Sequence, residues 1–160
     1  MNKFFKRLLI TILSLLIVFF IAKNILFNIY VSRHNTNALL KLKTVNTTNY
    51  NKFYAFIHDI ESETDWQVYV TSTFRTSQEQ ARLKKQDKRN ASAGHSKHNQ
   101  AEAIDLVLFQ NKGLLQTWVM KESKKERWEA TNVLQIAKKH QLRWGGTFTN
   151  YYDPVHFEID

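Results

Sequence analysis

Two histidines and one aspartate in the sequence have the types and spacing of a metal-binding set. His98 ends a polar loop, and Asp105 follows seven residues later inside an apolar, β-rich run. An aspartate among aliphatic neighbours is costly to bury unless a cation or hydrogen bonds compensate its charge. His156 could supply a third ligand and leave the fourth position of a tetrahedral zinc ion open for water. The spacing alone fits such a catalytic zinc site, and it also fits three hydrogen-bonded core residues.

The composition excludes several classes of site and indicates a folded domain. The 160 residues include no cysteine, which excludes a thiolate zinc site, an iron–sulfur cluster and a cysteine nucleophile. Low glycine and proline content, with 13% aromatic residues, indicates a folded domain rather than a disordered chain. His95 is expected at the rim of a cleft, and three further histidines are expected at the surface or at helix ends: His34, His58 and His140.

The segments around these residues predict an α+β domain with a mainly antiparallel sheet. Apolar spacing predicts a helix from about residue 50 to 60, and a capping box at Thr76–Glu79 predicts another over Ser77–Lys85. A long amphipathic helix is expected over Glu122–His140, and Asn111–Gly113 predicts a hairpin turn. The expected strands are Trp66–Val70, Ala103–Phe109, Leu142–Trp144 and Val155–Ile159.

The N-terminal part has the pattern of a membrane signal. Leu8–Ala22 is uncharged and apolar and would span about 22 Å as a helix, and residues 25–30 extend it. The run follows three basic residues, Lys3, Lys6 and Arg7. Basic flanks stay in the cytoplasm, so we expect a signal-anchor helix at about residues 8–30 with residues 32–160 on the other side of the membrane. A cleaved signal is the alternative, although Phe20 fits a signal-peptidase site badly.

These features divide the chain into an anchor (1–31), a polar linker (32–49) and a folded domain (50–160). The anchor holds four basic residues and no acidic one, which leaves +5 of the net charge of +9 to the remainder. A moderately basic domain fits either an anionic partner or ordinary solubility. We expect no nucleic-acid partner, because no such motif occurs and an exported domain rarely meets nucleic acid.

Three blocks of sequence are most informative when they are taken together and in order. Thr71–Gln80 reads Thr-Ser-Thr-Phe-Arg-Thr-Ser-Gln-Glu-Gln, and Ser96–Asp105 contains Ser-x-His-x6-Asp. Leu142–Gly146 reads Leu-Arg-Trp-Gly-Gly and is followed by Asp153–Glu158, which reads Asp-Pro-Val-His-Phe-Glu. From about residue 66 onward the chain thus resembles the zinc peptidases of the D-alanyl-D-alanine carboxypeptidase and L-alanyl-D-glutamate endopeptidase family. The similarity is strongest to the endopeptidase branch, familiar from phage endolysins.

The resemblance implies a fold and a mechanism. It implies an α+β fold, like that of D-alanyl-D-alanine carboxypeptidases and hedgehog domains, with one zinc ion per chain in a cleft. The ligands would be His98, Asp105 and His156. Asp153 matches the general base that takes a proton from the attacking water. Arg75 matches the arginine that binds substrate and stabilises oxyanion charge.

Other positions carry weaker expectations. Ser96 would steady the His98 loop or contact substrate, Glu158 would either bond a ligand or simply point outward from its strand, and Trp144 would pack beneath the site. The sequence departs from the family at Ala101 and Glu102, where the family has glycine and an aliphatic residue. Ala101 is costly if that position requires positive φ, and Glu102 adds charge between two ligands.

The function we expect is hydrolysis of peptidoglycan stem peptides by a membrane-anchored zinc metallopeptidase. The L-alanyl–D-glutamate bond is the first candidate, and removal of terminal D-alanine by a D,D-carboxypeptidase is the second. A non-catalytic zinc-binding or wall-binding module is the alternative from another class, and Asp153 and Arg75 argue against it. The expected location is the cytoplasmic membrane, with a single pass and the domain facing the periplasm or the extracytoplasmic side.

Overall fold

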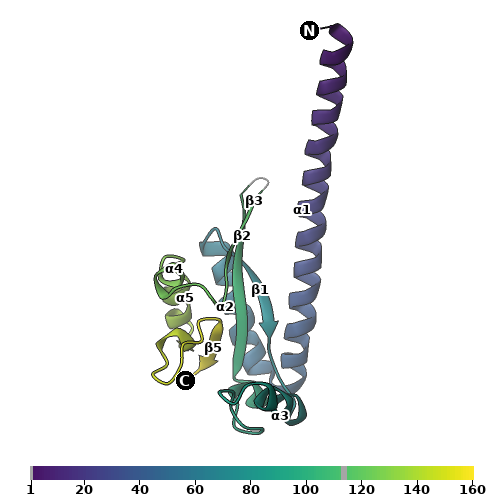
Figure 1. Cartoon of the computed structure of the whole chain (residues 1–160). Coiled ribbons are helices and arrows are strands. Elements are labelled where there is room, and N and C mark those ends of the chain that lie inside the picture. The colour runs from purple at the N-terminus through teal and green to yellow at the C-terminus, as the bar shows by residue number, and fades with distance from the viewer. Residues whose placement is uncertain (1, 113–114) are drawn as a thin grey trace.

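The computed structural model describes residues 2–112 and 115–160, and Figure 1 shows the arrangement of its elements. The helices are α1 (Lys3–Val45), α2 (Thr47–Glu63), α3 (Ser77–Gln86), α4 (Lys125–Glu129) and α5 (Val133–Lys139), with short 3-10 turns η1 (Lys97–Gln100) and η2 (Gly145–Thr147). The strands are β1 (Gln67–Ser72), β2 (Ala103–Lys112), β3 (Leu115–Val119), β4 (Leu142–Trp144) and β5 (His156–Ile159).

The sheet is antiparallel at every strand pair that the structure describes. Its order is β1-β2-β5-β4, and β3 also pairs with β2. The long strand β2 is therefore shared, because its first residues pair with β5 and its last residues pair with β3. Helices α2 and α5 pack into the core, whose largest fully buried side chains include Trp128, Phe53, Phe56, Phe109 and Phe157. The predicted α+β class with a mainly antiparallel sheet is confirmed.

Local sequence signals account for several element boundaries. The capping box of α3 is present, because the Thr76 hydroxyl accepts from the Glu79 amide and the Glu79 carboxylate accepts from the Thr76 amide. The hairpin turn expected at Asn111–Gly113 is wrong for its first two residues. Asn111 and Lys112 still belong to β2, and Gly113 lies outside the described residues.

The single long helix expected over Glu122–His140 is wrong. The structure has two short helices, α4 and α5, separated by a break at residues 130–132. Asn132 has a φ of 65°, and the Thr131 hydroxyl donates to the Trp128 carbonyl and accepts from the Val133 amide. A threonine that bonds nearby backbone groups competes with helical hydrogen bonding, which explains the break.

The linker expected at residues 32–49 is also wrong. Helix α1 continues without interruption to Val45, and α2 begins at Thr47. The C-terminal half of α1 packs against α2 and β1, and its buried residues are Val31, Asn35, Leu39 and Leu42. These residues recur every three or four positions and so form one face of the helix.

Asn35 closes the outer edge of the sheet. Its side-chain amide donates to the Val68 carbonyl at 2.8 Å, and its oxygen accepts from the Val70 amide at 2.9 Å. β1 is an edge strand, so these two backbone groups lack a neighbouring strand on that side. The helix thus replaces a missing strand, and residues 31–45 are part of the folded domain.

The N-terminal half of α1 is long and apolar enough to cross a membrane. None of its most apolar 18-residue window is buried against the rest of the chain. In Figure 1 this half of the helix extends beyond the domain.

Candidate metal centre

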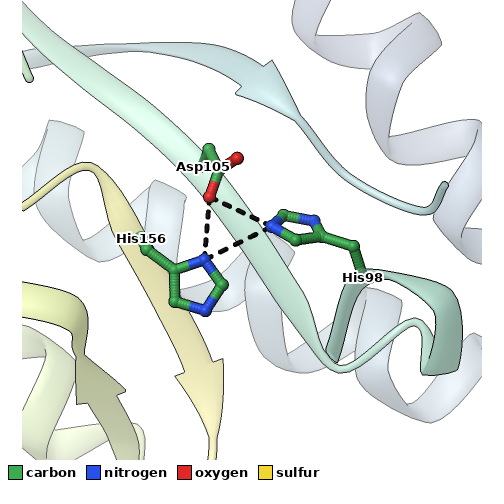
Figure 2. A group of neighbouring side chains, drawn as sticks. All are labelled: His98, Asp105 and His156. Carbon is green, nitrogen blue, oxygen red and sulfur yellow. Dashed lines mark hydrogen bonds and ion pairs between the residues drawn. The ribbon is translucent and has the colours of Figure 1, made fainter. Parts of the chain in front are cut away.

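The side chains of His98, Asp105 and His156 point toward one another in the structure (Figure 2). Asp105 Oδ1 lies 3.1 Å from His98 Nε2 and 2.9 Å from His156 Nδ1, and the two nitrogens are 3.3 Å apart. A tetrahedral zinc ion with bonds of about 2.0–2.1 Å has its ligand atoms about 3.3 Å apart. The three atoms therefore have nearly the spacing of one face of such a tetrahedron.

The sheet brings two of these residues together. Asp105 on β2 and His156 on β5 are cross-strand partners, and residues paired in this way have neighbouring side chains. His98 comes from η1, the short turn that precedes β2. The Ser96 hydroxyl caps this turn by accepting from the His98 amide at 3.3 Å. The His98 carbonyl accepts from the Arg75 amide at 3.2 Å, which ties the turn to the segment after β1.

The outer nitrogen of each imidazole is held by an acceptor. His98 Nδ1 lies 2.7 Å from the Thr73 carbonyl oxygen, and His156 Nε2 lies 2.9 Å from a Glu158 carboxylate oxygen. A carbonyl or a carboxylate can only accept, so each of these nitrogens carries a proton. His98 Nε2 and His156 Nδ1 are then left with lone pairs that face each other and Asp105. This is the orientation that histidine ligands require.

Three electron-rich atoms in contact need a cation between them. Burial raises the pKa of Asp105, but its interactions with His98 and His156 outweigh that effect and hold the pKa well below its usual range. Burial lowers the pKa of His156, but hydrogen bonds to Asp105 and Glu158 raise it to about 9. The protein alone meets this need with a proton on His156, and the donor set of two imidazoles and one carboxylate equally fits zinc.

Arg75 lies on the other oxygen of the same carboxylate. Its guanidinium forms an ion pair with Asp105 Oδ2 and donates from Nε to the Ser72 hydroxyl at 2.8 Å. The Asn99 side chain donates to the Arg75 carbonyl at 2.7 Å. Arg75 thus neutralises the outer face of Asp105, and its guanidinium is only partly exposed to solvent.

Asp153 stands in a tight turn just before β5. Its carbonyl accepts from the His156 amide at 3.1 Å, and its amide donates to the Gly145 carbonyl at 3.2 Å. Its Oδ1 is buried and has no hydrogen-bond partner, although the Lys121 ammonium lies 3.6 Å away. A buried carboxylate oxygen without a hydrogen bond is costly, so this oxygen has capacity to accept from a further group.

At both glycines before this turn, Gly145 and Gly146, a larger side chain would not fit. A Cβ at Gly145 would overlap the Asp153 carbonyl oxygen and would lie 3.0 Å from the His156 Cβ. A Cβ at Gly146 would overlap the indole of Trp144. Trp144 is buried, and its Nε1 donates to the Pro154 carbonyl at 2.7 Å. The Trp-Gly-Gly segment therefore supports the turn that carries Asp153.

The two positions that depart from the family pattern are accommodated differently. Ala101 does have a positive φ, 58°, so an alanine occupies a left-handed conformation that favours glycine. Its carbonyl accepts from the Asn49 side chain at 3.0 Å. Glu102 pairs with the Lys97 ammonium at 2.8 Å and contacts none of the three candidate ligands.

Sequence reasoning missed several residues around the centre. The Thr73 carbonyl, which orients His98, has no signature because it is a backbone group. The ring of Phe148 lies 5.7 Å from His156, and the Lys121 ammonium faces Asp153. Burial and the charges of Asp153, Glu158 and Asp105 raise the pKa of Tyr151. For Phe148 and Tyr151 the available signal was the aromatic segment ahead of the Asp-Pro-Val-His block, and for Lys121 the sequence held none.

Comparisons with known sequences find two similar peptidase descriptions. Residues 89–159 match the model of a family described as D-alanyl-D-alanine carboxypeptidase. The peptidoglycan L-alanyl-D-glutamate endopeptidase CwlK of Bacillus subtilis (strain 168) is 32% identical over 103 residues, 58% of this chain and 60% of that protein. The chain thus spans about three fifths of the length of that relative.

A solved structure has the same fold. The L-Ala D-Glu endopeptidase ChiX of Serratia marcescens matches with a TM-score of 0.56 and 17% identity, over 81% of this chain and 88% of that one. The family match covers the block that holds all three candidate ligands, and the relative CwlK carries the name of one of the two activities expected from the sequence. They confirm the resemblance of this chain to the family of D-alanyl-D-alanine carboxypeptidases and L-alanyl-D-glutamate endopeptidases.

Proposed function

We propose that the chain is a zinc metallopeptidase that hydrolyses peptidoglycan stem peptides, with the L-alanyl–D-glutamate bond as its preferred target. The observation that carries the proposal is the convergence of two imidazole lone pairs and one carboxylate oxygen on a single point. The named activity of CwlK supports the choice of substrate and bond.

His98, Asp105 and His156 would hold the metal ion. Zinc bound there would polarise the scissile carbonyl and lower the pKa of the attacking water. The chain's own contribution is to fix the donors, because Thr73 and Glu158 hold both imidazoles in the required tautomer. This leaves little reorganisation to occur when substrate arrives.

Asp153 is proposed as the general base. It lies three residues before a candidate ligand, and the backbone bond from His156 to the Asp153 carbonyl fixes the turn between them. Its Oδ1 lacks a hydrogen-bond partner and so is free to accept a proton from the attacking water. The protonated acid would then donate to the departing amine.

Arg75 and Ser96 are proposed to serve the substrate and the ligand turn. The Arg75 guanidinium lies beside Asp105 and is therefore placed to stabilise negative charge on a carbonyl oxygen at the centre. Ser96 is buried, and its cap on η1 favours a supporting role over direct contact with substrate. Glu158 and Trp144 support His156 and the Asp153 turn in the same way.

The apolar half of α1 is proposed to anchor the enzyme in the cytoplasmic membrane by a single pass. The basic flank would remain in the cytoplasm, and the domain would face the periplasm or the extracytoplasmic side. A cleaved signal would release the same domain, and a carbonate wash of membranes separates the two possibilities.

Digestion of purified peptidoglycan by the full-length chain in detergent with zinc tests the function. Mass spectrometry of the products should show new D-glutamyl amino termini and new L-alanyl carboxyl termini. Release of free D-alanine would instead identify the D,D-carboxypeptidase activity that the family description names. Bound zinc without any new termini, for the wild type as for Asp153→Asn, would show a non-catalytic binding module.

A further inference from the structure

We propose that the β2–β3 hairpin rests on the same membrane surface from which α1 emerges. The domain would then touch the bilayer at two places, with its candidate metal centre held away from the lipid. The inference rests on the proposed membrane span of α1 and adds a second lipid contact that the peptidase function does not require.

The hairpin runs beside α1 toward the N-terminal end of that helix (Figure 1). The Phe27 ring lies 5.3 Å from Phe109 and 6.2 Å from Trp118, and the rings meet edge to face. The Asn111 side chain donates to the Asn28 side chain at 3.2 Å. These contacts fix the height of the hairpin along the helix.

That height coincides with the edge of the bilayer. A hydrocarbon core of about 30 Å takes up about 20 helical residues, so a span that begins at Leu8 ends near Phe27. Asn111 is level with Asn28, and the next cross-strand pair, formed by Lys112 and Leu115, lies about 3 Å nearer the membrane. With the core ending near Phe27, this pair falls at the boundary between the hydrocarbon core and the headgroup layer, which is about 5–7 Å thick on each side.

The side chains at this level suit a lipid interface. Leu115 is 74% exposed, which is unfavourable in water and favourable among headgroups and upper acyl chains. The Trp118 ring lies beside Phe27, and Tyr30, three residues after Phe27 on α1, is exposed; tryptophan and tyrosine concentrate at membrane interfaces. A bilayer is therefore the partner that this end of the hairpin fits.

Two contacts would fix the orientation of the enzyme. Asp105 lies seven residues before Lys112 in the same strand, which is about 23 Å along β2. The candidate metal centre would thus stand about 20–25 Å from the edge of the hydrocarbon core, because α1 has no flexible joint before the domain. The stem peptides within reach would be those close to the membrane.

Single-cysteine labelling tests this contact directly, because the chain has no native cysteine. Leu115→Cys, Lys85→Cys and Leu13→Cys would each be made in the full-length protein, labelled with the fluorophore NBD and reconstituted in phosphatidylethanolamine–phosphatidylglycerol vesicles. Lys85 is exposed on α3, at the opposite end of the domain, and Leu13 lies in the proposed span. Nitroxide-labelled lipids would serve as quenchers, and Gln116→Cys, also exposed, repeats the measurement at a neighbouring position.

Quenching at residue 115 at least twofold above that at residue 85, together with strong quenching at residue 13, is the expected result. Equal quenching at 115 and 85, with residue 13 quenched, would overturn the hairpin contact and leave the anchor in place. Absence of quenching at residue 13 would overturn the anchor and the hairpin contact together. Peptidoglycan digestion by the same variants in detergent is scored separately, so a failure of the peptidase proposal is distinguishable from either result.

Discussion

Glu158 should control the zinc affinity through the imidazole that it holds. One carboxylate oxygen accepts from His156 Nε2 at 2.9 Å, and the other accepts from the Arg143 guanidinium. Glu158→Gln keeps the size of the side chain but leaves one acceptor for two donors. If the amide oxygen faces His156, the amide nitrogen faces Arg143. If the amide oxygen faces Arg143, the amide nitrogen faces His156 Nε2 and forces the His156 proton onto Nδ1, the nitrogen that should bind metal.

The size of the effect follows from these two choices. Arg143 is half exposed and can turn to water, so the first arrangement costs less and keeps the His156 tautomer. The lost carboxylate charge still makes the imidazole a poorer donor. Removing such a partner typically lowers metal affinity 10- to 100-fold, which is about 1.4–2.7 kcal/mol. Zinc affinity would be measured by chelator competition at pH 7 on the wild type and the variant.

Glu102→Gln is the matched control. It removes the same charge just before β2, next to Ala103, the cross-strand partner of Glu158, and its carboxylate pairs with Lys97. Its zinc affinity should stay within about twofold of the wild type. Equal affinities for Glu158→Gln and the wild type would refute the idea that Glu158 orients His156.

Three further predictions concern the base, the pH dependence and the helix. Asp153→Asn should bind zinc normally and hydrolyse peptidoglycan at least ~10²-fold more slowly than the wild type. Asp105→Asn should lose metal and activity together. Normal turnover by Asp153→Asn would exclude Asp153 as the base. Zinc must displace a proton from His156, whose pKa is raised to about 9. The zinc affinity should therefore rise about tenfold per pH unit between pH 6 and 8 and flatten above pH 9. Chelator competition that shows no such slope would contradict the proton on His156. Asn35→Ala should lower the free energy of unfolding by about 2–4 kcal/mol, because two β1 backbone groups lose their hydrogen-bond partners. Denaturant titration would measure the change, and an unchanged midpoint would show that Asn35 does not close the sheet edge.

The sequence predicted the elements that carry the candidate ligands because the signals for these elements are local. Short β-rich runs bounded by polar segments gave the strands that hold Asp105 and His156, and the Ser-x-His-x6-Asp spacing placed His98 just before the first of them. The structure adds that these two strands are direct neighbours, which no local pattern specifies. That pairing is what turns three scattered residues into one triangle of donors.

Two errors had different physical causes. The break in the helix expected over Glu122–His140 depends on one hydroxyl, that of Thr131, and on a left-handed Asn132, and both are compatible with a helical pattern. The continuation of α1 beyond residue 31 is indicated by the spacing of four residues. Val31, Asn35, Leu39 and Leu42 lie on one helical face, but the polar residues between them suggested a linker.

The continuation of α1 connects the proposed anchor to the candidate metal centre through one residue, Thr73. The Thr73 hydroxyl donates to the Ala38 carbonyl of α1 at 2.8 Å, and the Thr73 carbonyl accepts from His98 Nδ1 at 2.7 Å. The helix that is proposed to cross the membrane therefore supports the residue that sets the tautomer of a candidate ligand. Because α1 also closes the edge of β1, a displacement of the helix would move the β1 edge and Thr73 together. The position of the anchor and the geometry of the donors are thus set by the same packing.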